Sequence, residues 1–220
     1  MSTVRIHLTR HGEVHNPDGI LYGRLPGYGL SELGHRMAQR VGEHFTGGDF
    51  TVRALVRSPL LRTAETIAPL ASALGMEPRE DPRVIEAANR FEGQHAGAAN
   101  FLQLKNLPLV YNPLRPSWGE PYTAQVVRMR AAMATLRREL EAIARDESLD
   151  TVDGVIVSHQ LPIWVTRLAA QGRPLVHDPR RRECALASVT TFTYEGGKLA
   201  GVHYDDVSAD LQPAKNVAGA

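Results

Sequence analysis

The hydrophobic positions alternate at the start of the chain and then change to a helical spacing. Val4, Ile6 and Leu8 alternate with polar residues, which predicts a strand that ends at Thr9-Arg10-His11-Gly12. A predicted helix follows from an N-cap at Ser31 to Gly47-Gly48, with apolar residues along one face at Leu33, Met37, Val41 and Phe45. The first unit of the chain is therefore a strand followed by a core-packing helix.

Two further short apolar strands are each followed by a helix. The first covers residues 52–56, and the helix beginning at Ser58-Pro59 has its expected inward positions at Leu61, Ala64, Ile67, Ala68 and Ala71. The second covers residues 155–157, ends at Ser158-His159-Gln160 and leads into an apolar helix over 161–170. This alternation favours an α/β fold, a three-layer α/β/α sandwich with a mostly parallel central sheet.

The longest predicted helix begins at Glu120-Pro121, and its apolar positions repeat at steps of three and four: Val126, Met129, Met133, Leu136, Leu140 and Ile143. Residues 189–194 and 199–204 predict two strands joined by a hairpin at 195–198. Residues 93–119, which contain three prolines, lack a clean period and predict a small cap insertion with one or two helices around 96–107. We expect one domain over 1–208 and a flexible tail over 209–220.

Composition narrows the classes of partner. The chain of 220 residues is 43% hydrophobic and has a net charge of +1, so it can bury a substantial core and offers no general electrostatic case for nucleic acid or membrane binding. The single cysteine, Cys184, excludes an internal disulfide framework and cysteine-based zinc sites. No apolar signal core or run of transmembrane length is present, so a cytoplasmic location is expected.

The candidate chemistry lies at three predicted junctions between a strand and a helix. They carry Arg10 with His11, then Arg62, then His159, and in a parallel sheet all four side chains would come from one edge. An arginine in the first turn of a helix opposes the helix dipole unless an anion compensates it, although Arg62 could equally be a solvated surface residue. Two guanidiniums and an imidazolium suit a phosphoryl dianion, with a neutral histidine as nucleophile and a carboxylic acid as proton donor.

The ordered motifs resemble the histidine phosphatase superfamily, in the branch of the phosphoglycerate mutases and related phosphatases, over roughly residues 4 to 204. Arg10-His11-Gly12-Glu13 resembles the nucleophile motif, and the segment over 58–66 resembles the second motif with its phosphate-binding arginine. Ile85-Glu86 is similar to the segment of the general acid, Gly119-Glu120 to another recurring element, and Val157-Ser158-His159 to the second histidine.

The resemblance implies roles for individual residues. His11 becomes phosphorylated, Glu86 is the general acid with Glu92 as the alternative, and Arg10, Arg62 and His159 bind the phosphoryl group. We assign Asn16, Gly23, Arg24 and Gln160 to substrate binding, and we assign no metal and no cofactor. In the family an asparagine usually lies six residues after the nucleophile, whereas Asn16 lies five residues after His11.

The sequence favours a phosphomonoester hydrolase that acts on a small phosphorylated metabolite through a phosphohistidine. A phosphoglycerate mutase-type transferase, a non-catalytic phosphate-binding module and a metallohydrolase are the alternatives. No His-x-His or His-Glu-x-x-His spacing supports the metallohydrolase. The run Arg180-Arg181-Arg182 is interpreted as a solvated loop, with attraction of an anionic substrate as the other reading. Monomer and homodimer both remain open.

Overall fold

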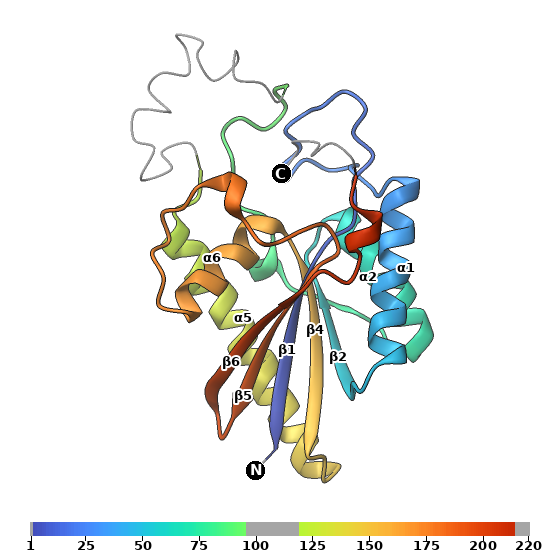
Figure 1. Ribbon diagram of the computed structural model, residues 1–220, viewed down its shortest axis with the longest axis vertical. Helices are drawn as coiled ribbons and strands as arrows, with labels where there is room; N and C mark the ends of the chain where they lie inside the picture. The colour runs from blue at the N-terminus through green and yellow to red at the C-terminus, as the bar shows by residue number, and fades with distance from the viewer. Residues whose placement is uncertain (1, 96–118, 214–220) are drawn as a thin grey trace.

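The computed structural model describes residues 2–95 and 119–213, which form a central sheet with helices on both faces (Figure 1). Six strands lie in the order β3-β2-β4-β1-β5-β6. Along the chain the elements are β1 (Thr3–Arg10), α1 (Glu32–Gly47), β2 (Val52–Arg57), α2 (Leu61–Leu74), β3 (Arg79–Glu80), the 3₁₀ helix η1 (Pro82–Val84), α5 (Tyr122–Asp146), β4 (Thr151–Ser158), α6 (Gln160–Ala170), η3 (Pro179–Arg181), β5 (Val189–Glu195), β6 (Lys198–Asp205) and η4 (Ala209–Leu211).

The two faces of the sheet carry separate hydrophobic cores, which confirms the predicted three layers. Helices α1 and α2 cover one face, and α5 and α6 cover the other (Figure 1). On β1, Val4, Ile6 and Leu8 belong to the core with α5, whereas His7 points to the opposite face and contacts Phe45 of α1. The alternation in the sequence thus assigns each side chain of β1 to a face.

The sheet is mixed. Strands β1 to β4 are parallel, as predicted, and the hairpin of β5 and β6 continues the sheet antiparallel to β1. The register pairs Arg10 of β1 with Ser158 of β4, and Arg57 of β2 with Val157 of β4. The carboxyl ends of these three strands therefore meet at one edge, and the residues that follow them share one location.

Two element boundaries differ from the prediction. Helix α2 begins at Leu61 rather than at Ser58, and the Leu61 side chain is 46% exposed instead of buried. Ala64 and Ala68 also lie outside the core. The residues before the helix are not helical, and Ser58 among them is fully buried. Strand β4 begins at Thr151, four residues earlier than predicted, because it includes a buried polar residue, Asp153, that interrupts the apolar run.

The chain continues beyond β6 into the turn η4. This turn begins at Ala209, and Asp210 within it pairs with Arg40 of α1, while the predicted domain limit at 208 stays a prediction. Most of the predicted cap, including its expected helices, and the remainder of the tail from residue 214 lie outside the described residues. Within the described ranges, no helix is both long enough and apolar enough to cross a membrane.

Candidate active site

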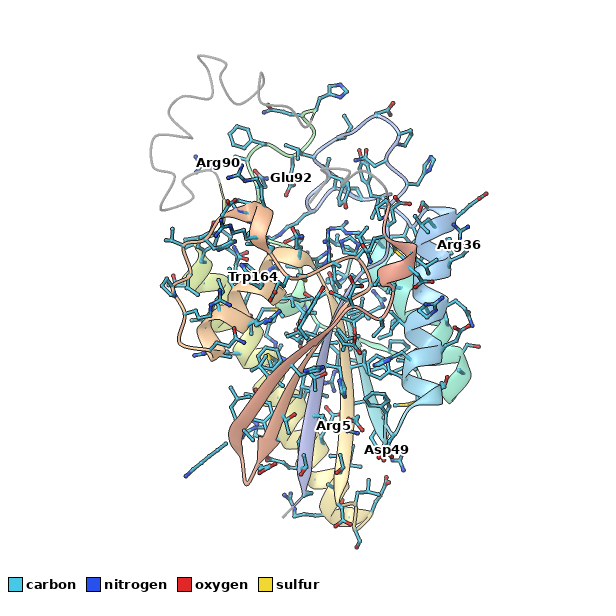
Figure 2. All side chains as sticks on the ribbon, in the orientation of Figure 1. Arg5, Arg36, Asp49, Arg90, Glu92 and Trp164 are labelled. Carbon is cyan, nitrogen blue, oxygen red and sulfur yellow. The ribbon has the colours of Figure 1, made fainter. Side chains whose placement is uncertain are left out.

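The predicted catalytic residues meet at the carboxyl edge of the parallel strands. His11 follows β1 and His159 follows β4, and both side chains are fully buried. Arg62, in the first turn of α2, is 1% exposed, so the alternative of a solvated surface arginine is wrong. Figure 2 shows side chains crowded at this edge, below the loop that carries the labelled residues Arg90 and Glu92.

His11 is oriented so that one ring nitrogen remains free. Its Nδ1 lies 2.7 Å from the Gly12 carbonyl, which can only accept, so Nδ1 carries the proton. Burial, with Arg62 and Arg10 nearby, lowers the pKa of His11 well below its ordinary value and keeps the ring neutral. The lone pair at Nε2 is therefore available, and Nε2 contacts no hydrogen-bond partner among the described residues.

The Gly12 turn allows this geometry because it packs directly on helix α1. A Cβ at position 12 would lie 2.7 Å from the Gly34 carbonyl, so a larger residue would displace the turn. The Gly12 N–H donates to the Thr66 hydroxyl at 3.0 Å. The backbone that orients His11 is thus held by both helices of that face.

Glu86 and His159 form a second buried pair. Glu86 Oε2 lies 3.9 Å from His159 Nδ1, while Oε1 accepts from the Ala87 N–H at 2.7 Å. Burial raises the pKa of the Glu86 carboxyl and lowers that of His159 well below its usual value, so both groups favour the uncharged form. The shift in the pKa of Glu86 is in the direction that a general acid requires.

His159 is held between an arginine and a serine. Arg62 Nη2 donates to Nδ1 at 3.2 Å, and Nε2 lies 2.8 Å from the Ser58 hydroxyl. The same Nη2 donates to the Gly23 carbonyl at 2.6 Å, and the guanidinium carbon lies 4.8 Å from the centre of the Tyr22 ring. These contacts fix the Arg62 side chain, whose charge persists although burial lowers its pKa.

Four buried polar atoms around these residues have no hydrogen-bond partner in the described part of the chain: His11 Nε2, Glu86 Oε2, Arg10 Nε and Arg62 Nε. The ring centres of His11 and His159 are 5.2 Å apart. Buried polar atoms are normally paired, because leaving one unpaired costs roughly 1–3 kcal/mol. An imidazole, a carboxyl group and two guanidiniums left in this state indicate a site for an anionic reactant.

The predicted substrate-binding residues have different roles in the structure. Asn16 exchanges two hydrogen bonds with the backbone of Ile20, so it closes a loop, and substrate binding by its amide stays a prediction. Gly23 accepts from Arg62 through its carbonyl. Arg24 Nε donates to the Glu86 carbonyl at 2.7 Å, and substrate binding by Arg24 stays a prediction.

The loop that carries Glu86, the predicted general acid, is held by three sets of hydrogen bonds. Ser158 Oγ donates to the Val84 carbonyl at 2.7 Å, and Arg24 holds the carbonyl of Glu86 itself. Glu92, the alternative acid, accepts from the backbone N–H groups of Arg24 and Asn89 at 3.1 and 3.3 Å. Glu86, not Glu92, is thus the carboxyl group that lies beside His159.

Comparison with known proteins identifies the family. A profile described as the histidine phosphatase superfamily, branch 1, matches residues 6–207. The chain belongs to this superfamily. An uncharacterized protein of Mycobacterium tuberculosis is 43% identical over 213 residues, covering 93% of this chain and 97% of that protein. Membership of the histidine phosphatase superfamily supports a phosphatase-type enzyme.

Solved structures of the superfamily share the fold. A mycobacterial glucosyl-3-phosphoglycerate phosphatase has a TM-score of 0.73 at 22% identity, covering 92% of this chain and 97% of that one. A phosphoglycerate mutase of Bacillus anthracis has a TM-score of 0.68 at 18% identity, covering 94% and 95% of the two chains. A putative alpha-ribazole-5'-P phosphatase of Escherichia coli has a TM-score of 0.65 at 19% identity, covering 91% and 95%.

Three site residues were missed by the sequence analysis. Ser58 contacts His159, Tyr22 covers the guanidinium of Arg62, and Thr66 accepts from the Gly12 N–H. Ser58 follows β2 directly, at the same edge as His159, so the strand-end rule could have included it. Thr66 lies in the segment over 58–66 that resembles the second motif but was not named as a site residue, and Tyr22 carries no comparable signal.

The interpretation of the arginine run as a solvated loop is correct only in part. Arg180 and Arg181 are exposed, and Arg180 pairs with Asp178. Arg182 is partly buried and donates from Nη1 to Gln160 Oε1 at 3.3 Å. Among the described residues, no group of three or more His, Cys, Asp or Glu side chains could hold a metal ion.

Proposed function

We propose that this chain is a phosphomonoester hydrolase that works through a phosphohistidine at His11 and acts on a small phosphorylated metabolite. The observation that supports this most strongly is geometric: a buried imidazole whose Nε2 has no partner among the described residues lies in the same site as a buried carboxyl group beside the second histidine. Binding a phosphate alone requires neither a nucleophile nor an acid.

In the first step, the lone pair of His11 Nε2 attacks phosphorus while the bond to the leaving oxygen breaks. Glu86 gives its proton to that oxygen, so the alcohol leaves uncharged. The lowered pKa of His11 and the raised pKa of Glu86 both favour the protonation states that this step requires. The products are a phosphohistidine and the Glu86 carboxylate.

In the second step, a water molecule attacks the phosphohistidine and the carboxylate of Glu86 takes its proton. The bond between phosphorus and Nε2 breaks, the lone pair returns to His11, and inorganic phosphate leaves. Arg10 and Arg62 donate to the equatorial oxygens in both steps, and they supply positive charge without a metal ion. We assign His159 to the same phosphoryl group as a further hydrogen-bonding residue.

The test is hydrolysis of an aryl phosphate in the presence of a chelator, with inorganic phosphate measured directly. Wild type should hydrolyse the ester, and the kcat of His11→Ala should be lower by about 10⁴-fold or more. The matched control is His35→Ala on the exposed face of α1, which should keep the wild-type rate. Loss of wild-type activity on chelation would instead favour a metallohydrolase. Release of the aryl alcohol without inorganic phosphate would favour transfer to another acceptor.

A further inference from the structure

Arg182 is fixed in place by uncharged partners. It follows the short turn η3, and its Nε donates to His177 Nε2 at 2.9 Å, while Nη1 donates to Gln160 Oε1 at 3.3 Å. The His177 ring in turn lies against Tyr122, with ring centres 5.5 Å apart. The guanidinium is therefore held by a loop and by the start of helix α6, and its own charge is not neutralised by these contacts.

A short chain of contacts joins Arg182 to the phosphoryl site. Gln160 directly follows His159, and its Nε2 donates to the Cys184 carbonyl at 3.4 Å. The same carbonyl accepts from Arg10 Nη1 at 2.8 Å. Arg182 also acts on the general acid: burial raises the pKa of Glu86, and Arg182 is one of the cations that oppose this effect. Arg182 is thus connected through Gln160 and the Cys184 carbonyl to Arg10, one of the residues assigned to the phosphoryl group.

The positive charge at the site exceeds what one phosphoryl group requires. Arg10 and Arg62 supply two charges, which match a phosphoryl dianion. Arg182 adds a third, and within residues 2–95 and 119–213 no carboxylate forms an ion pair with it. Arg24 and Arg128, by contrast, share Glu120 as their partner. A partly buried cation without a counter-ion is costly unless a ligand supplies the negative charge.

We infer that Arg182, oriented by Gln160 and His177, binds a second anionic group carried by the leaving part of the substrate. This inference rests on the proposed function. The substrate class is then a phosphate monoester whose alcohol bears a carboxylate or another phosphoryl group. Gln160, which the sequence assigns to substrate binding, acts as a positioning residue for Arg182.

The test compares matched esters in the full-length protein. Phenyl phosphate has an uncharged leaving group, 2-, 3- and 4-carboxyphenyl phosphate add a carboxylate at different positions, and 1,3-phenylene bisphosphate adds a second phosphoryl group. The readout is the ratio of kcat/KM for each anionic ester to that for phenyl phosphate. Wild type should prefer at least one anionic ester, and the preferred ester identifies the kind of anion.

Arg182→Gln should lower that ratio by about tenfold to a hundredfold, as expected for loss of a hydrogen bond between charged groups. Arg181→Gln removes one positive charge at the exposed neighbouring position and should keep the wild-type ratio. Arg182→Lys retains the charge without the planar fork, so its ratio should lie between those of wild type and Arg182→Gln. This third variant keeps the test valid if Arg182→Gln melts at a lower temperature.

An equal ratio in wild type and in both Arg182 variants would overturn the subsite while leaving the hydrolase intact. A wild-type enzyme that prefers phenyl phosphate would do the same. If wild type hydrolyses none of the esters, the proposed function fails first, and the subsite fails with it.

Discussion

Two buried histidines four residues apart, His7 on β1 and His11 just after it, show opposite uses of the same side chain. Burial lowers the pKa of both rings. Around His7 each ring nitrogen has a partner: Thr191 Oγ1 at 2.9 Å from Nδ1 and Asp153 Oδ1 at 2.8 Å from Nε2. His11 Nε2 has none among the described residues. A ring satisfied on both sides stabilises the fold, whereas a ring free at one nitrogen can react.

The carboxyl groups beside the two histidines differ in the same way. Asp153 accepts from Arg5 Nε at 2.6 Å and from the Thr51 N–H at 2.6 Å (Arg5 is labelled in Figure 2). Burial opposes its ionisation, but hydrogen bonds from His7 and Arg5 hold its pKa below the usual value. Glu86 is buried without such donors at Oε2, and its pKa is raised. Both carboxyl groups are buried, and the difference in hydrogen-bond donors thus sets whether the pKa is raised, as for Glu86, or lowered, as for Asp153.

After the loss of His11 itself, the largest expected effect comes from Glu86, the carboxyl group with no hydrogen-bond partner at Oε2 among the described residues. Glu86→Gln should lower kcat by about 10² to 10⁴-fold for an alkyl phosphate, because the amide cannot protonate a poor leaving group. The loss should be much smaller for 4-nitrophenyl phosphate, whose leaving group needs little protonation. Steady-state rates for the two esters measure this difference, and an equal loss for both would contradict the role of Glu86 as acid.

Removing the charge of Asp153, the carboxyl group beside His7, should lower stability rather than activity. Asp153→Asn leaves Arg5 and His7 without their carboxylate and should lower the free energy of unfolding by about 3 kcal/mol. Asp210→Asn, which breaks the exposed pair with Arg40, is the matched control and should change it little. Urea titration measures both. The kcat of the folded Asp153 variant should remain near wild type, and a large fall in kcat would show that the two regions are coupled.

The smallest expected effect is a dependence of stability on pH, to which both His7 and His11 contribute. Their folded-state pKa values lie below the ordinary value of about 6.5, so below that pH the unfolded chain binds more protons. Stability should therefore fall as the pH falls from about 6.5 through the lowered pKa values. Each buried histidine contributes up to about 1.4 kcal/mol per pH unit. The slope measured by urea titration should be smaller in His11→Ala, and an unchanged slope would show that His11 is protonated in the folded protein.

The sequence could predict the positions of His11, Arg62 and His159 because each follows a strand with a clear apolar pattern. Parallel strands bring their carboxyl ends to one edge, so local patterns suffice to assemble these groups. The choice of Glu86 as the acid came from a family resemblance, and the structure brings its carboxyl group to His159.

Other parts of the site depend on contacts that no local pattern encodes. Arg182 reaches Gln160 across 22 positions of sequence, and Tyr22 reaches Arg62 from a different loop. The early start of β4 was missed because Asp153 is polar yet buried, and its burial depends on Arg5 and His7 of another strand. Long-range pairing of polar side chains is therefore what the sequence patterns could not supply.

The most direct measurement of the central claim is rapid quenching of the enzyme with an aryl phosphate, followed by digestion with trypsin at neutral to alkaline pH and mass spectrometry. Cleavage after Arg10 and Arg24 releases a peptide that contains both His11 and His15. The account predicts a phosphoryl group on the His11 imidazole of this peptide, formed and lost within one turnover. A phosphoryl group on His15, or turnover with no phosphorylated histidine in the chain, would contradict it.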